Sequence, residues 1–128
     1  MSIRFITPNQ HGVIDFAVAA ALVVAPFVLG LGASSPWAIW ISVATGLVIV
    51  VQSLLTDYRF GLARILPFWA HLAMDGAVGV AYALVPVFLG FSGIDAIYYW
   101  VNAAAVLTVV SLGLTHQPAP RAPAYARA

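Results

Sequence analysis

Two hydrophobic stretches of this sequence each begin with the same ionisable pair. His11 precedes Asp15 by four residues, and His71 precedes Asp75 by the same interval. Side chains four residues apart share one face of a helix, so the histidine of each pair can hydrogen-bond its aspartate. Imidazole and carboxylate are ordinary ligands of zinc and non-haem iron, and both groups also carry protons. The two pairs therefore suggest a metal site, a porphyrin site between His11 and His71, or a proton pathway.

Packing is the simpler explanation of these pairs. An ionised aspartate costs roughly 2.5–3.5 kcal/mol at the centre of a membrane and less near the interface, and a histidine partner lowers that cost. On this interpretation each pair stabilises the entrance of a helix that faces its neighbours, and we expect this role from the sequence. The alternative is one shared site with His11, Asp15, His71 and Asp75 as metal ligands. His116, which follows the last hydrophobic stretch, is a further candidate ligand.

The chain that carries these pairs is otherwise almost free of charge. Of its 128 residues 63% are hydrophobic and only 7% are charged, and the mean hydropathy is +1.02. A soluble domain usually has about 25% charged residues, so this composition indicates that lipid surrounds the protein. The absence of cysteine excludes disulfides and thiolate metal sites. A net charge of +1 gives no indication of a nucleic-acid partner.

Four apolar segments are long enough to cross a bilayer, which takes about 20 residues per helix. They span about 13–31, 37–55, 68–91 and 96–114. All four are continuous apolar runs, without the alternation that the strands of a membrane barrel require. The sequence therefore predicts an all-α polytopic membrane protein with four transmembrane helices and the lipid bilayer as a partner. Polar residues inside the segments, Ser42, Asn102 and Thr108, are expected to hydrogen-bond between helices.

The arginines indicate which side of the membrane each end faces. All five lie at the N-terminus, in the middle connection or in the C-terminal tail: Arg4, Arg59, Arg64, Arg121 and Arg127. With four spans these three regions share one side, which the positive-inside rule assigns to the cytoplasm. We therefore expect a protein of the bacterial inner membrane with both termini in the cytoplasm. The tail at 117–128 is rich in proline and alanine and is expected to be disordered.

A shift of sixty residues aligns the two halves of the chain without a gap. His11 then meets His71, and Asp15 meets Asp75. An even number of spans per repeat keeps both copies in the same orientation, related by an axis along the membrane normal. We therefore expect one domain at 1–116, built from two tandem parallel two-helix repeats at about 8–56 and 68–116. Further matches in the same register are Pro26 with Pro86, Gly30 with Gly90, and Trp40 with Trp100.

Each half also carries a short motif around its proline. The motif reads APFVLGL at 25–31 and VPVFLGF at 85–91, and a tryptophan, Trp40 or Trp100, follows near the start of the next segment. This pattern resembles the SPW-repeat family of small bacterial integral membrane proteins, over most of residues 11–114. The literal SSPW at 34–37 lies in a connection, and we interpret it as a coincidence. The resemblance implies a multi-pass architecture and no particular activity.

Two hypotheses of the protein's function remain. No phosphate-binding loop, nucleophile elbow or HExxH motif is present, and the parts outside the spans are too small for a catalytic domain. This favours a non-enzymatic structural or accessory subunit that forms a homo-oligomer or joins a larger membrane complex. The alternative is a membrane protein that binds a metal or porphyrin, or relays protons, through the paired histidines and aspartates. No specific cofactor is indicated.

Overall fold

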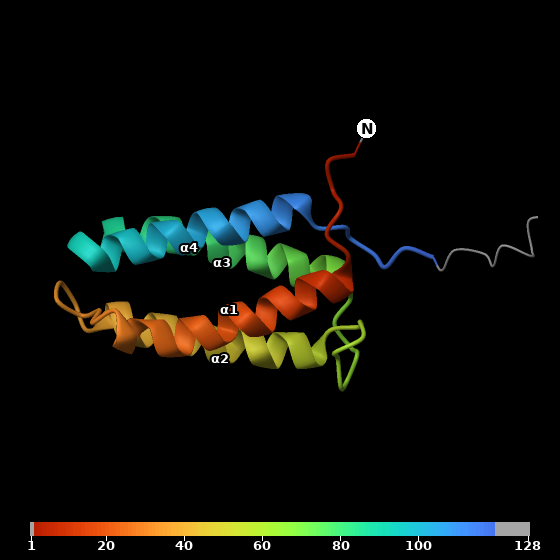
Figure 1. The fold of residues 1–128 in the computed structure, drawn as a ribbon, viewed down its shortest axis with the longest axis horizontal. Coiled ribbons are helices and arrows are strands. Elements are labelled where there is room, and N and C mark those ends of the chain that lie inside the picture. The colour runs from red at the N-terminus through yellow and green to blue at the C-terminus, as the bar shows by residue number, and fades with distance from the viewer. Residues whose placement is uncertain (1, 120–128) are drawn as a thin grey trace, which may run out of the picture.

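A computed structural model describes residues 2–119, which form four helices of similar length (Figure 1). They are α1 at Pro8–Val28, α2 at Trp37–Leu55, α3 at Phe68–Leu89 and α4 at Gly93–Leu112. Each is long and apolar enough to cross a membrane. Within the described residues the only β-structure is two isolated bridges, so the all-α prediction is confirmed. Most of the tail predicted to be disordered, 120–128, lies outside the described residues.

The four helices form two hairpins that point the same way. α1 packs against α2, and α3 packs against α4, with both short turns at one end of the bundle (Figure 1). The N-terminus, the connection between α2 and α3, and the end of α4 lie together at the opposite end. α1 and α3 therefore run parallel, as a tandem duplication of a two-helix unit requires.

α1 begins earlier in the chain than the sequence predicts. Thr7 caps the helix by accepting from the backbone of Gln10, whose side chain in turn accepts from the backbone of Thr7. Pro8 occupies the first turn, where its missing N–H costs nothing. The helix therefore begins at Pro8 and not near residue 13. Consequently both His11 and Asp15 belong to its first two turns.

The two repeats contact each other at the end of the bundle where α1 begins and α4 ends. Ile6, just before α1, pairs with Gly113 after α4, and Leu66, just before α3, pairs with Thr56 after α2. Each repeat thus begins alongside the end of the other repeat. Arg4 strengthens one of these contacts, since its guanidinium donates to the Gly113 carbonyl oxygen at 2.6 Å. A cation at the C-terminus of a helix also interacts favourably with the helix dipole.

At the opposite end Asp95 joins the second hairpin to the first. Its buried carboxylate, in the first turn of α4, accepts from the backbone N–H groups of Gly32 and Ser34, each at 2.9 Å. The Ser34 hydroxyl donates to the same carboxylate. The sequence placed the start of this helix at 96 and assigned Asp95 no role. Its contacts hold the turn between α1 and α2 against α4.

Of the three polar side chains expected to hydrogen-bond between helices, only Ser42 does so. Ser42 donates to the Leu22 carbonyl at 2.8 Å and lies 2.7 Å from the Tyr98 hydroxyl, so its expected interhelical role is confirmed. For Asn102 and Thr108 that expectation is wrong. Both donate to carbonyls four residues back in their own helix. Short polar side chains reach that carbonyl without any partner helix.

Candidate metal centre

The four ionisable side chains of the two pairs meet between α1 and α3, near the end of the bundle where α1 begins and α4 ends. We call His11, Asp15, His71 and Asp75 the His/Asp cluster. All four are buried, with exposed fractions of 1%, 7%, 0% and 6% respectively. One nitrogen or oxygen atom from each lies within 4.8 Å of the corresponding atoms of the other three. The residues are therefore one cluster and not two separate pairs.

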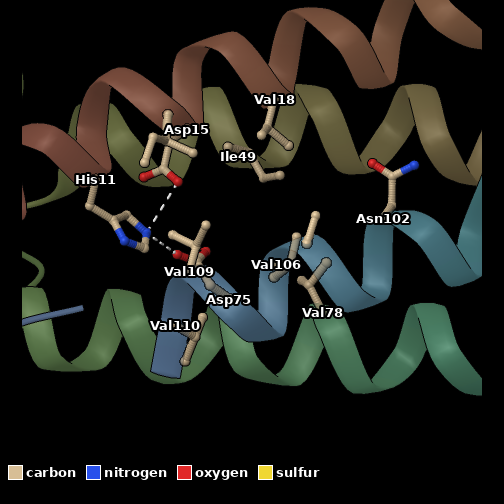
Figure 2. Close-up of a pocket in the computed structure, with 12 residues that line it drawn as sticks. His11, Asp15, Val18, Ile49, Asp75, Val78, Asn102, Val106, Val109 and Val110 are labelled. Atoms are coloured by element: carbon tan, nitrogen blue, oxygen red, sulfur yellow. Dashed lines mark hydrogen bonds and ion pairs between the residues drawn. The ribbon is translucent and has the colours of Figure 1, made fainter. Parts of the chain in front are cut away.

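The shortest contacts of the cluster cross between the helices. His11 Nε2 lies 2.8 Å from Asp75 Oδ2, and His71 Nε2 lies 2.8 Å from Asp15 Oδ2. The contacts expected within each helix also exist but are longer, at 3.2 Å in α1 and 3.1 Å in α3. Figure 2 shows the His11 ring reaching both carboxylates. Each histidine thus bridges an aspartate of its own repeat and one of the other repeat.

Aromatic rings surround the two histidines. Phe68, the first residue of α3, stacks on His71 and meets the edge of His11, with ring centroids 5.5 and 5.4 Å away. Tyr58, from the connection between α2 and α3, lies 6.0 Å from the His71 ring. A side chain on Gly12 would collide with Tyr58, since its Cβ would lie 2.4 Å from that ring. Gly12 therefore lets the connection pack directly on α1 beside the cluster.

Gln52 and Thr56, near the end of α2, support the half of the cluster that α3 provides. The Gln52 amide donates to Asp75 Oδ1 at 2.8 Å, and Thr56 Oγ1 lies 2.6 Å from His71 Nδ1. Thr56 donates its single hydroxyl proton to the Gln52 carbonyl at 2.7 Å, so it accepts from His71 and Nδ1 carries a proton. These residues were not predicted. Their signal in the sequence is two polar side chains four residues apart in an apolar segment.

The half that α1 provides has no equivalent support. The sixty-residue shift places Leu112 opposite Gln52 and His116 opposite Thr56. Leu112 has no hydrogen-bond donor. His116 is exposed, and its Nδ1 lies 3.3 Å from Oγ1 of the neighbouring Thr115. Among the described residues, nothing hydrogen-bonds the buried His11 Nδ1. The candidate ligand His116 is therefore not among the four residues that the structure brings together.

The arrangement of donor atoms suits a single metal ion. Zinc binds histidine nitrogen and carboxylate oxygen at about 2.0–2.2 Å, which separates neighbouring ligands of a tetrahedral site by about 3.4 Å. The four nitrogen-to-oxygen distances of the cluster, 2.8–3.2 Å, are slightly below that value. The carboxylates lie between the two histidines, where a porphyrin bound to both rings would need room for its plane. The geometry thus favours an ion over a porphyrin.

Comparison with known protein families identifies a similarity over most of the chain. The model of a family described as the SPW repeat domain matches residues 9–116. The matched region contains both hairpins and all four residues of the His/Asp cluster. No curated protein and no solved structure matches the chain. The match supports the architecture that the repeated proline motif indicated and adds no activity.

Proposed function

This chain belongs to the SPW repeat family, and we propose that it is a non-enzymatic membrane protein whose two repeats are joined by one divalent metal ion. One observation carries the proposal. The buried His/Asp cluster brings two imidazole nitrogens and two carboxylate oxygens from different helices within 4.8 Å of one another. Zinc is the ion that best suits two histidines and two carboxylates in a four-coordinate site.

The chemistry of the cluster favours a structural role for this ion. Each repeat supplies one histidine and one aspartate, so neither repeat alone completes four ligands. A site with four protein ligands is of the closed type that stabilises folds, whereas catalytic zinc sites keep a position for water or substrate. A divalent ion also neutralises the charges of Asp15 and Asp75, which lowers the cost of placing them inside the membrane. Thr56, as acceptor for His71 Nδ1, would orient that ligand.

A metal-free pair of salt bridges is the second candidate. It is favoured by the nitrogen-to-oxygen distances, all of which permit hydrogen bonds. Without an ion, however, balancing two ionised carboxylates takes two imidazolium cations, each with a proton on both ring nitrogens. The Nδ1–H of His11 has no acceptor among the described residues in either case, but without an ion it would belong to a buried cation. Metal binding needs neither histidine to be charged.

The membrane placement is part of the proposal. We place the protein in the bacterial inner membrane with both termini in the cytoplasm, as one domain at 1–116 with repeats at 8–56 and 68–116. Support comes from Arg4, Arg59 and Arg64, which lie in the N-terminal segment and the connection gathered at one end of the bundle. The cluster then lies in the cytoplasmic half of the membrane. Assembly into a homo-oligomer or a larger complex would be measured as the mass of the detergent-purified particle.

Elemental analysis of detergent-purified protein tests the metal. We expect about one transition-metal ion per chain, with loss of that ion in both His11→Asn and His71→Asn. His116→Asn is the matched control, because this histidine is exposed and lies outside the cluster; it should retain the ion. If the protein carries no metal and takes up none from added zinc salt, the cluster is the metal-free salt-bridge network.

A further inference from the structure

A cavity of about 130 Å³ lies beside the His/Asp cluster (Figure 2). Three of the four cluster residues, His11, Asp15 and Asp75, line one end of it, whereas His71 does not. Asn102 of α4 lies at the other end (Figure 2). The wall between these two polar ends is aliphatic and is formed by side chains from all four helices, such as Val106 of α4.

The cavity lies on the side of the cluster where the second repeat differs from the first. On the α2 side, Gln52 fills the space next to Asp75 and hydrogen-bonds it. The position equivalent to Val106 in the first repeat is Gly46, where α2 packs so closely on α1 that a Cβ would lie 2.8 Å from the Ala19 carbonyl oxygen. The first repeat therefore has no free space at Gly46, whereas the second repeat has a cavity at the equivalent residue, Val106.

The mouth of the cavity opens on the side of the bundle. Ala105, on the wall that α4 provides, is exposed, and Ile14 and Val18 of α1 are half-buried. These residues lie within helices long and apolar enough to cross a membrane. A molecule that reaches the cavity between α1 and α4 therefore comes from the lipid, and it must be apolar enough to dissolve there.

The polar groups of the cavity select one kind of ligand. At one end, Asp15 and Asp75 already accept from the histidines of the cluster, and Asp75 also accepts from Gln52. Each carboxylate has about four acceptor sites, however, and can accept a further hydrogen bond. One N–H of the Asn102 amide is bonded to the Tyr98 carbonyl at 2.8 Å, and no described residue donates to the amide oxygen, which can therefore accept at the other end. Both ends accept hydrogen bonds, and an engineered apolar cavity of about 150 Å³ holds benzene. We propose that this cavity binds a small membrane-soluble molecule of about the size of phenol, with an apolar body and one hydrogen-bond donor.

Two probes of the same shape test the proposal by fluorine NMR on the detergent-purified full chain. 4-Fluorophenol carries a donor, and 4-fluorotoluene has a methyl group in its place. We expect 4-fluorophenol to bind saturably and at least about tenfold more tightly, since a hydrogen bond to a charged acceptor typically contributes that much. Equal affinity for the two probes would show that the polar ends play no part and would overturn the proposal.

Paired variants separate the cavity from the detergent micelle. Val106→Phe fills the cavity and should abolish saturable binding, whereas Val101→Phe changes a residue of the same helix that is 62% exposed and outside the cavity, and should leave binding intact. Binding that survives Val106→Phe would contradict the assignment. If that variant does not fold, Ala105→Leu narrows the mouth instead and should lower the affinity. The zinc-free protein should also bind 4-fluorophenol. A protein that holds zinc but does not bind the probe would therefore contradict the cavity proposal alone.

Discussion

His71 lies closer to Asp15 of the other repeat, at 2.8 Å, than to Asp75 of its own helix, at 3.1 Å. His11 shows the same preference, with 2.8 Å to Asp75 and 3.2 Å to Asp15. The His/Asp cluster is therefore made by the duplication and does not exist within a single repeat. A change in one half must consequently affect cluster side chains that belong to the other half.

The first prediction follows from these cross-contacts. Asp15→Asn should abolish zinc binding and lower the stability of the detergent-solubilised protein by about 3–5 kcal/mol, the typical cost of removing one partner from a buried charged network. The double change His11→Asn with Asp15→Asn should be no milder, because it removes the closer cross-repeat partner of both His71 and Asp75 and leaves them their longer mutual contact at 3.1 Å. Zinc content and thermal unfolding measure both effects. A loss near 0.6 kcal/mol for the double variant, the average for polar contacts in membranes, would instead indicate two independent packing pairs.

The second prediction concerns the unequal support of the two halves. Thr56→Val removes the acceptor for His71 Nδ1 and should weaken zinc binding about 10- to 100-fold, as expected for a residue that orients a metal ligand. Thr108→Val is the matched control, since that hydroxyl is exposed and bonds only to its own helix. Competition with a chelator of known affinity measures both. Equal zinc affinity of the two variants would show that Thr56 does not position the ligand.

The third prediction separates the two ends of the bundle. Asp95→Asn keeps one acceptor oxygen but replaces the other with an amide NH2, so that the N–H of either Gly32 or Ser34 faces a donor, and should cost about 1–3 kcal/mol of stability. Zinc content should stay unchanged, because the cluster lies at the opposite end. Asp57→Asn, at an exposed position, is the control and should alter neither quantity. Loss of zinc from Asp95→Asn would mean that the two ends of the bundle depend on each other.

The sequence predicted the fold because lipid imposes simple requirements. Four apolar runs of sufficient length and a repeat in one register led to the helices and their parallel arrangement. The register also placed His11 and His71 at a common depth. The cross-pairing was not predicted, because spacing along one helix fixes the contact with Asp15 but not the rotation of α1 relative to α3. That rotation depends on packing, including the contact of Tyr58 with Gly12.

The supporting residues were missed for a related reason. Gln52 and Thr56 have no counterparts in the second repeat, so a search for matched residues passes over them. The start of α1 was also placed too late, since hydropathy alone does not register the cap that Thr7 and Gln10 form. Both the Gln52/Thr56 pair and the Thr7/Gln10 cap are polar residues at the ends of apolar segments. Hydropathy and repeat matching do not detect such residues.

The last prediction tests the orientation in the membrane. The chain has no cysteine, so single cysteines can be labelled without background. Ser92→Cys lies between α3 and α4, and Ala63→Cys lies between α2 and α3; both positions are exposed. If the arginine-bearing end is cytoplasmic, a membrane-impermeant thiol reagent added outside intact cells should label Ser92→Cys, and should label Ala63→Cys only after permeabilisation. Each variant controls for the reactivity of the other. The reverse pattern would place the termini and the His/Asp cluster toward the outer face, so that metal would have to be supplied from outside the cell.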